Sequence, residues 1–180
     1  SALSRIDVSD IPAKIAGQVP TEGEGAFNPD DYIEPKEQRK MDTFIHFALG
    51  AADMAIKDSG IADIIAQEAE RIGVLIGSGI GGLPVIESVV KLIEEKGARR
   101  VSPFFIPACL INLASGQVSI KYGLKGPNHS VVTACSTGAH AIGDAGRLIM
   151  FGDADVMVAG SAESTICRSG MAGFAAARAL

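Results

Sequence analysis

The sequence contains no tryptophan, and only 5% of its residues are aromatic. Cysteine is nearly as scarce, since Cys109, Cys135 and Cys167 are the only three in 180 residues. Three cysteines this far apart form neither a disulfide framework nor a zinc-ligand pattern. We therefore expect no disulfide scaffold, no metal site and a reducing, cytoplasmic environment.

Long apolar runs and an excess of positive charge are also lacking. No apolar stretch reaches about 18 residues, the length that spans a bilayer, and residues 1–5 lack the apolar core of a signal peptide. The formal net charge of −5 disfavours nucleic acid as a partner, because phosphate-binding surfaces need a basic footprint. A chain of this length, 47% hydrophobic, can build one domain with a real core.

What the chain does contain is glycine, at 21 residues, and segments that alternate between helix and strand patterns. Residues 1–35 carry several prolines and favour an irregular arm with one short strand near residues 14–19. Apolar residues at helical spacing predict one long helix over residues 36–59, ended by Gly60. The other expected elements are strands at 71–77, 130–134 and 155–159 and helices at 84–96, 108–122 and 136–151. The last strand, helix and strand form a βαβ unit, so the predicted fold class is α/β with parallel strands.

Residues 77–82, GSGIGG, satisfy the G-x-G-x-x-G pattern between a strand and a helix. Taken alone, the pattern suggests a dinucleotide site. That fingerprint also expects a second strand ending in an acidic residue about 20 residues further on, whereas Glu94 and Glu95 lie inside the predicted helix. We therefore expect no nucleotide cofactor. The glycines then serve close backbone packing or form the wall of another substrate pocket.

The sharpest chemical signal is the segment 131–138, VVTACSTG, in which an apolar strand runs into Cys135 and small residues open a helix. Such a turn places the side chain at the carboxyl end of a parallel strand, where α/β folds bind ligands. It also places the sulfur beside the free N–H groups of a helix amino terminus, which favour the nucleophilic thiolate. A buried structural cysteine is the alternative. Cys109 and Cys167 lie on no comparable turn, and we interpret both as structural.

A nucleophilic cysteine usually needs a base or a charged partner. The chain offers only His46, His129 and His140. His140 is five positions past Cys135 on a different helix face, His129 lies at the far end of the preceding strand, and His46 is on the polar side of the long helix. We interpret all three as structural or solvated. If Cys135 is a nucleophile, its partners lie outside this chain.

Several segments together resemble one family. The run VVTACSTGAHAIGDAGRLI followed by GDADVMVAGSAE is similar to the active-site region of the type II β-ketoacyl-acyl-carrier-protein synthases. KEQRKMDTF (36–44), IGSGIGGL (76–83), SPFFIP (102–107), YGLKGPN (122–128) and GFAAARAL (173–180) fit in order and approximate spacing. The resemblance covers almost the whole chain from Ile6 onward and rests on independent motifs.

The resemblance implies a thiolase-like layered fold of two related halves, each a mixed five-stranded sheet with helices. Residues 1–180 would be the N-terminal half, lacking the family's first strand. The family's other half carries both catalytic histidines, a supporting lysine and the phenylalanine loop that completes the oxyanion hole. We therefore do not expect this chain alone to complete the reaction.

By the same resemblance, Cys135 would attack the thioester of an acyl chain held by acyl carrier protein, and its backbone N–H would donate to the oxyanion hole. Malonyl-carrier protein would then lose carbon dioxide and attack the acyl-cysteine. The positions expected to line the acyl tunnel are Ile80, Phe105, Ile106, Gly170 and Phe174. Of these, Phe105 and Ile106 match residues that a partner subunit contributes, so the resemblance implies a homodimer. Without the resemblance, ordinary core packing would explain these residues.

Lys36, Arg39 and Lys40 form a basic cluster in an otherwise acidic chain. The resemblance implies that they dock the acidic carrier protein through charge complementarity, which chiefly aids encounter and register. A solvated helix face is the alternative. Positive charges at a helix amino terminus oppose its dipole, so they do not obviously serve stability.

Other readings remain open. A thiolase or an initiating synthase acting on coenzyme A thioesters would share the fold, but the type II motifs disfavour it. A non-catalytic partner subunit that shapes chain length typically lacks the cysteine, and Cys135 is present. The chain could also act only as an interaction fragment. A nicotinamide-dependent oxidoreductase fits least, because Glu94 and Glu95 lie inside the predicted helix and not at the end of a second strand.

Overall fold

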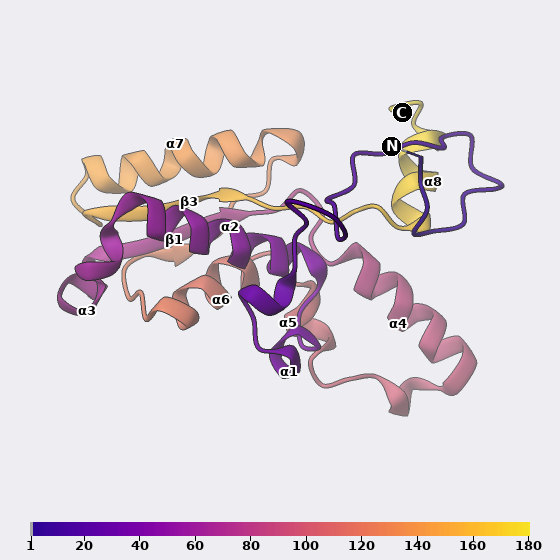
Figure 1. Cartoon of the computed structure of the whole chain (residues 1–180), viewed down its shortest axis with the longest axis horizontal. Coiled ribbons are helices and arrows are strands. Elements are labelled where there is room, and N and C mark those ends of the chain that lie inside the picture. The colour runs from indigo at the N-terminus through magenta and orange to yellow at the C-terminus, as the bar shows by residue number, and fades with distance from the viewer. Residues whose placement is uncertain (1) are drawn as a thin grey trace.

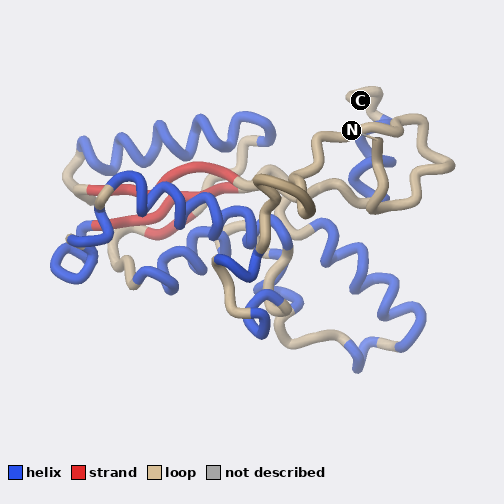
Figure 2. Tube along the Cα trace, viewed as in Figure 1, coloured by secondary structure: helices blue, strands red, loops and turns tan. Residues whose placement is uncertain are grey.

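The computed structural model describes residues 2–180 as an α/β layer with an irregular N-terminal arm (Figure 1). Three strands lie at its centre, with α7 (Thr137–Met150) on one face and α2 (Thr43–Ser59) and α6 (Leu113–Tyr122) on the other. The arm and α8 (Arg168–Ala176) lie beside the body, and both ends of the chain meet there (Figure 2). The α/β fold class predicted from the sequence is confirmed.

The sheet is parallel, in the order β2-β1-β3. The central strand β1 (Ile72–Gly77) is buried along its whole length, as expected of a parallel strand covered on both faces. Its edge partners are β2 (Asn128–His129) and β3 (Val156–Ser161), in a register that pairs Val74 with Asn128 and Ile76 with Gly160. The predictions of strands at 71–77 and 155–159 are confirmed.

The predicted strand at 130–134 is wrong, because β2 ends at His129. Beyond His129, hydrogen bonds from side chains replace the backbone hydrogen bonds between the strands. The Ser130 hydroxyl donates to the carbonyl of Ile76 at 2.9 Å, and the buried Ser115 hydroxyl donates to the carbonyl of His129 at 2.8 Å. Strand β2 precedes α7 and β3 follows it. The two strands are parallel, but they are not neighbours, because β1 lies between them. Three strands, rather than a mixed set of five, form the sheet of the described residues.

The long helix predicted over 36–59 is two helices, α1 (Pro35–Gln38) and α2. Asp42 causes the break: its carboxylate caps α2 by accepting from the N–H of Phe44 at 3.3 Å. The predicted end is confirmed, because Gly60 adopts the left-handed conformation at φ 72°. The inner face of α2 carries Phe44 and Ile45, both fully buried in the main core.

Helix α7 agrees with the helix predicted over 136–151, whereas α8 lies where no helix was predicted. Helix α4 (Leu83–Lys96) ends at Gly97 as expected. The helix predicted over 108–122 is divided into α5 (Phe105–Cys109) and α6, because Leu110 is extended at ψ 130°. The strand predicted near 14–19 reduces to one antiparallel bridge between Ala2 and Ile15. Short helical turns complete the fold, at Pro29–Asp31, Ile61–Asp63, Ile65–Glu68, Ala69–Arg71, Ala98–Arg100 and Ala134–Ser136.

Within residues 2–180, no helix combines the length and the apolar character needed to cross a membrane. The same residues contain no cluster of three or more His, Cys, Asp or Glu side chains arranged to hold a metal ion.

Candidate active site around Cys135

Cys135 lies in the middle of a 3-10 turn, η5 (Ala134–Ser136), that leads directly into α7. The residue before it, Ala134, has φ 50°, a left-handed conformation that costs a residue with a Cβ about 1–2 kcal/mol. The buried Thr137 stabilises this turn: its hydroxyl donates to the Ala134 carbonyl at 2.7 Å and accepts from the N–H of Thr133 at 2.9 Å. Backbone strain held in place by neighbouring contacts is typical of functional sites.

The Cys135 side chain is exposed, and it makes no hydrogen bond to the part of the chain that the structure describes. Cys135 lies two residues before Thr137, the first residue of a 14-residue helix whose first N–H groups lack acceptors within the helix. A nucleophile needs this combination of an accessible sulfur and a positive local dipole. The sequence-based expectation of a strand-to-helix turn is met in the turn and the helix, although the strand stops earlier.

A hollow of about 310 Å³ opens beside Cys135. Two of the predicted acyl-tunnel residues, Ile80 and Phe174, line it together with the sulfur-bearing residue. Each has about 40% of its surface exposed, so apolar surface faces an open space. The structure thus brings together residues that are 55 and 39 positions from Cys135 in the sequence (135 − 80 and 174 − 135).

The other three predicted tunnel residues do not line this hollow. Gly170 is buried at the start of α8, where an added Cβ would lie 2.1 Å from the carbonyl oxygen of Thr165. Phe105 and Ile106 lie in α5, and Ile106 is 55% exposed. Their role in a tunnel stays a prediction that requires a second subunit.

The glycine loop between β1 and α4 forms one wall of the hollow, and it is fastened by a carboxylate that sequence reasoning missed. Glu163 accepts a hydrogen bond from the Ser78 hydroxyl through Oε1 and one from the N–H of Ile80 through Oε2, both at 3.0 Å. A signal existed in the sequence: Glu163 and Ser78 follow two parallel strands, whose carboxyl ends meet at one edge of the sheet.

The rejection of a dinucleotide site is supported by the amino end of α4. A phosphate would bind there to free N–H groups, but the Asp42 carboxylate already accepts from the N–H of Val85 at 3.0 Å. Burial raises the pKa of Asp42, although its hydrogen bonds to Phe44 and Val85 act in the opposite direction. One buried side chain therefore caps two helices and occupies the anion position.

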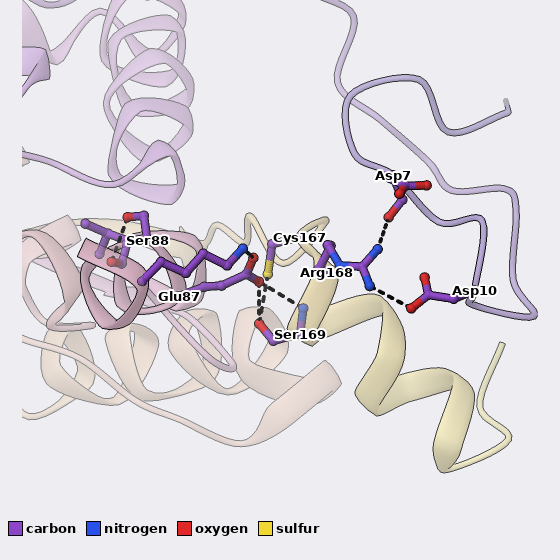
Figure 3. A network of polar contacts seen from close by, with 9 residues as sticks. Asp7, Asp10, Glu87, Ser88, Cys167, Arg168 and Ser169 are labelled. Carbon is purple, nitrogen blue, oxygen red and sulfur yellow. Dashed lines mark hydrogen bonds and ion pairs between the residues drawn. The ribbon is translucent and has the colours of Figure 1, made fainter. Parts of the chain in front are cut away.

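Helix α8, which carries Phe174, is anchored by a polar network (Figure 3). Its own N-cap residue, Cys167, makes no capping hydrogen bond. Glu87 of α4 supplies the cap instead, accepting from the N–H and the hydroxyl of Ser169 at 2.9 and 2.8 Å. On the other side, Arg168 donates to the carbonyl of Asp7 and to the carboxylate of Asp10 in the N-terminal arm. The wall of the hollow is thereby tied to both α4 and the arm.

We expect Glu87→Ala to lower the free energy of unfolding by about 2 kcal/mol, the scale of a lost charge-assisted hydrogen bond. Lys91 and the N–H of Ser169 lower the pKa of Glu87 from 4.5 to about 2. Because its pKa is lower in the folded state, ionised Glu87 stabilises the fold fully above its unfolded-state pKa. This stabilisation declines as the pH falls from there, and it is lost below about pH 2. Chemical denaturation of Glu87→Gln should therefore show a deficit that narrows between about pH 5 and about pH 3. An equal deficit at both pH values would contradict this account, and Glu95→Gln on the exposed face of α4 is the control.

None of the three histidines lines the hollow. His140 Nδ1 lies 2.6 Å from the Thr133 hydroxyl, and His46 Nε2 lies 3.1 Å from the carbonyl of Gln38. His46 is half-buried rather than solvated, and this burial lowers its pKa. His129 is exposed on β2. The described residues thus offer Cys135 no histidine base.

The other two cysteines have packing roles. Cys109 donates to the carbonyl of Ile106 at 3.3 Å, and burial raises the pKa of its thiol. Cys167 is buried with 6% of its surface exposed. Neither lines the hollow, which agrees with the structural role expected from the sequence.

The basic cluster is less uniform than the sequence suggested. Lys36 and Arg39 are exposed around α1. Lys40 is engaged locally: it pairs with Glu37 at 2.7 Å and lies 5.1 Å from the centre of the Phe104 ring. Because α2 begins only at Thr43, the cluster lies outside its first turn, and the argument from the dipole of a long helix no longer applies.

An accessible cysteine on a strained turn, beside an apolar hollow at the carboxyl edge of a parallel sheet, is typical of domains that hold a substrate group on sulfur. Residues 2–180 match the family described as "Beta-ketoacyl synthase, N-terminal domain". The chain is a member of this family.

The names of similar proteins are more specific than the description of the family. The chain is 60% identical over 180 residues to 3-oxoacyl-[acyl-carrier-protein] synthase 2 of Rhizobium meliloti (strain 1021) and 49% identical over 178 residues to the protein of the same name in Coxiella burnetii. Each alignment covers 99% of this chain, but only 43% and 42% of the relative. The chain therefore spans less than half the length of these relatives.

Solved structures confirm the thiolase-like condensing-enzyme fold. A type II PKS ketosynthase, in complex with its acyl-carrier protein and bound to the hexaketide, matches 83% of this chain at 28% identity and a TM-score of 0.75, and 43% of its own chain is covered. The ishigamide ketosynthase/chain length factor matches 98% of this chain at 21% identity and a TM-score of 0.81, with 42% of that chain covered. The latter supports the fold alone.

Proposed function

We propose that the full-length protein bearing this domain is a 3-oxoacyl-[acyl-carrier-protein] synthase, an acyltransferase of fatty acid elongation. The observation that carries the proposal is the exposed Cys135 on its strained turn, opening on a hollow lined by Ile80 and Phe174. The relatives that share up to 60% of these residues bear that name. The isolated domain supplies the nucleophile and part of the acyl pocket.

In the first step the Cys135 sulfur attacks the carbonyl carbon of an acyl thioester on acyl carrier protein. A new sulfur–carbon bond forms, the bond to the carrier sulfur breaks, and the carrier leaves with a free thiol. The backbone N–H of Cys135 would stabilise the oxyanion, a contribution of about 3 kcal/mol per donor. The hydrocarbon tail would lie in the hollow, whose lining is mostly apolar.

In the second step malonyl-carrier protein loses carbon dioxide, and the resulting carbanion attacks the acyl carbon. The cysteine thiolate leaves, and the product is a 3-oxoacyl chain on the carrier. This step needs groups that stabilise an enolate, and the described residues contain no histidine at the hollow to do so. We therefore assign this step to the full-length protein.

The proposal is tested by incubating the full-length protein with acyl- and malonyl-carrier protein and weighing the products. A 3-oxoacyl-carrier product longer by one two-carbon unit supports it. Absence of both acyl transfer to the protein and condensation would favour the rival interpretation, a non-catalytic partner or interaction subunit of the same fold.

The finer points of assembly are also proposals. Phe105 and Ile106 are apolar residues of α5 with no place in the hollow, and Ile106 is 55% exposed. Contact with the site of a second copy would explain both, which favours a homodimer. A reducing cytoplasm suits the three free cysteines.

We further propose that Lys36 and Arg39 dock the acidic carrier protein, and that Lys40 contributes less because Glu37 already pairs with it. We expect Lys36→Glu/Arg39→Glu to raise KM for acyl-carrier protein about tenfold with little change in kcat, because rim charges mainly affect encounter. Steady-state kinetics at two salt concentrations measure this, since the wild-type KM should rise with salt and the variant's KM should respond less. Lys96→Glu, at the far end of α4, is the control. An unchanged KM in the double variant would contradict the docking assignment.

A further inference from the structure

One wall of the hollow beside Cys135 is made by a segment with little rigidity of its own. Residues 77–82 include four glycines, and Gly81 has φ 75°. Glycine loses more conformational freedom on ordering than any other residue. The Ile80 side chain therefore depends on contacts from outside the loop to keep its place in the wall.

Glu163 supplies those contacts through both carboxylate oxygens. One oxygen accepts from the Ser78 hydroxyl and the other from the N–H of Ile80, each at 3.0 Å. The Ser78 hydroxyl in turn accepts from the N–H of Gly81 at 3.0 Å. The loop is thus bound on both sides of Ile80 by one side chain and its hydrogen-bonded neighbour.

Glu163 is itself held in register with the loop. The parallel ladder pairs Gly77 with Ser161, and the N–H of Ala162 continues it by donating to the Gly77 carbonyl at 3.1 Å. The carboxylate also fits closely against the loop, since a Cβ added at Gly79 would lie 2.9 Å from its Oε2. The Glu163 side chain therefore extends from a fixed position at the end of β3.

The same side chain lines the hollow with Cys135, Ile80 and Phe174. Within the described residues, its hydrogen bonds go to the loop and none goes to the turn that holds Cys135. An effect on the shape of the hollow is therefore expected before an effect on the reactivity of the sulfur.

From this geometry we infer that Glu163 is a positioning residue that fixes Ile80 in the wall and thereby determines how long an acyl chain the hollow accepts. The inference deepens the proposed function and rests on it for the identity of the substrate. The placement of Ile80 by Glu163 does not depend on that identity, so the two are tested separately.

The test uses the full-length protein and two chemical probes, a short and a long N-alkyl iodoacetamide. The Cys135 thiolate displaces iodide from each, and peptide mass spectrometry gives the rate at this residue. We expect Glu163→Ala to lower the ratio of the long-probe rate to the short-probe rate about tenfold, because a displaced wall misplaces the long chain most. The ratio of the two rates should fall less in Glu163→Gln, which keeps one acceptor oxygen. It should also fall less in Ser78→Ala. Glu95→Ala, an exposed carboxylate of α4, should keep the wild-type ratio.

An unchanged ratio in Glu163→Gln, Ser78→Ala and Glu163→Ala would overturn the inference, as would an equal slowing of both probes. If Glu163→Ala does not fold, the two milder variants still decide the matter. A second readout is hydrogen exchange of the Ile80 amide, which should accelerate in each Glu163 variant. If carrier-bound acyl groups fail to load Cys135 while the probe ratio still responds to Glu163, the proposed function fails and the positioning role stands.

Discussion

Cys135→Ala in the full-length protein is expected to abolish condensation, with turnover reduced at least about a thousandfold. The substitution removes the only exposed cysteine of the described residues, and with it the atom that would carry the acyl group. Because alanine adopts the same backbone conformations, the η5 turn and α7 should survive, and the melting temperature should stay close to that of the wild type. Product formation from acyl- and malonyl-carrier protein is the measurement.

Two matched variants separate the nucleophile from the other thiols. Cys109→Ala changes a thiol whose pKa is raised by burial and whose hydrogen bond goes to Ile106. Cys167→Ala changes a thiol with 6% of its surface exposed. Both variants should lose stability at most and keep turnover. Turnover that survives Cys135→Ala, or disappears in Cys109→Ala with the fold intact, would show that another residue holds the acyl group.

Gly77→Ala is expected to have the largest effect on stability, about 3 kcal/mol or complete failure to fold. Gly77 ends β1, and an added Cβ would lie 2.2 Å from the Val131 carbonyl oxygen and 2.3 Å from the Thr137 Cγ2. These neighbours belong to the segment that forms the Cys135 turn. The chain cannot relieve the clash without moving that turn, so the loss of stability should be accompanied by slower loading of Cys135. Chemical denaturation and acyl loading are the two measurements.

Gly160→Ala is the matched control on the neighbouring strand. Its position pairs with Ile76, one step from Gly77 in the register, and an added Cβ would meet nothing within 4 Å. We expect a change within about 0.5 kcal/mol. Similar losses in both variants would mean that strand glycines are generally required here, and the close approach at Gly77 would not explain the result.

The elements that the sequence predicted well are those in which one local signal decides. No other local signal conflicted with the apolar residues of β1 or with the helical spacing in α4, α7 and most of α2. The errors occur where side chains replace backbone partners. Asp42 starts α2 by capping it, and the hydroxyls of Ser115 and Ser130 take over at the end of β2. The two hydroxyl contacts join residues distant in sequence, and no periodicity reveals them, whereas the Asp42 cap is a local signal that the sequence prediction overlooked.

The site shows the same division. The turn around Cys135 follows from the pattern of small residues after an apolar segment, and the resemblance added Ile80 and Phe174, which the structure places at the same hollow. Glu163 and Glu87 were not foreseen. Each acts across more than 80 positions, on Ile80 and on Ser169, and only the arrangement of β1, β3, α4 and α8 brings these groups together. Phe105, Ile106 and Gly170 remain predictions, because their proposed contacts are not within this chain's hollow.

The most direct test of the central claim is peptide mass spectrometry of the unmodified full-length protein after incubation with acyl-carrier protein alone. The proposed function predicts one added acyl group on the peptide that carries Cys135 and none on the peptides with Cys109 or Cys167. Absence of the adduct, or its appearance on either of the other cysteines, would contradict the claim that this domain supplies the acyl-accepting nucleophile.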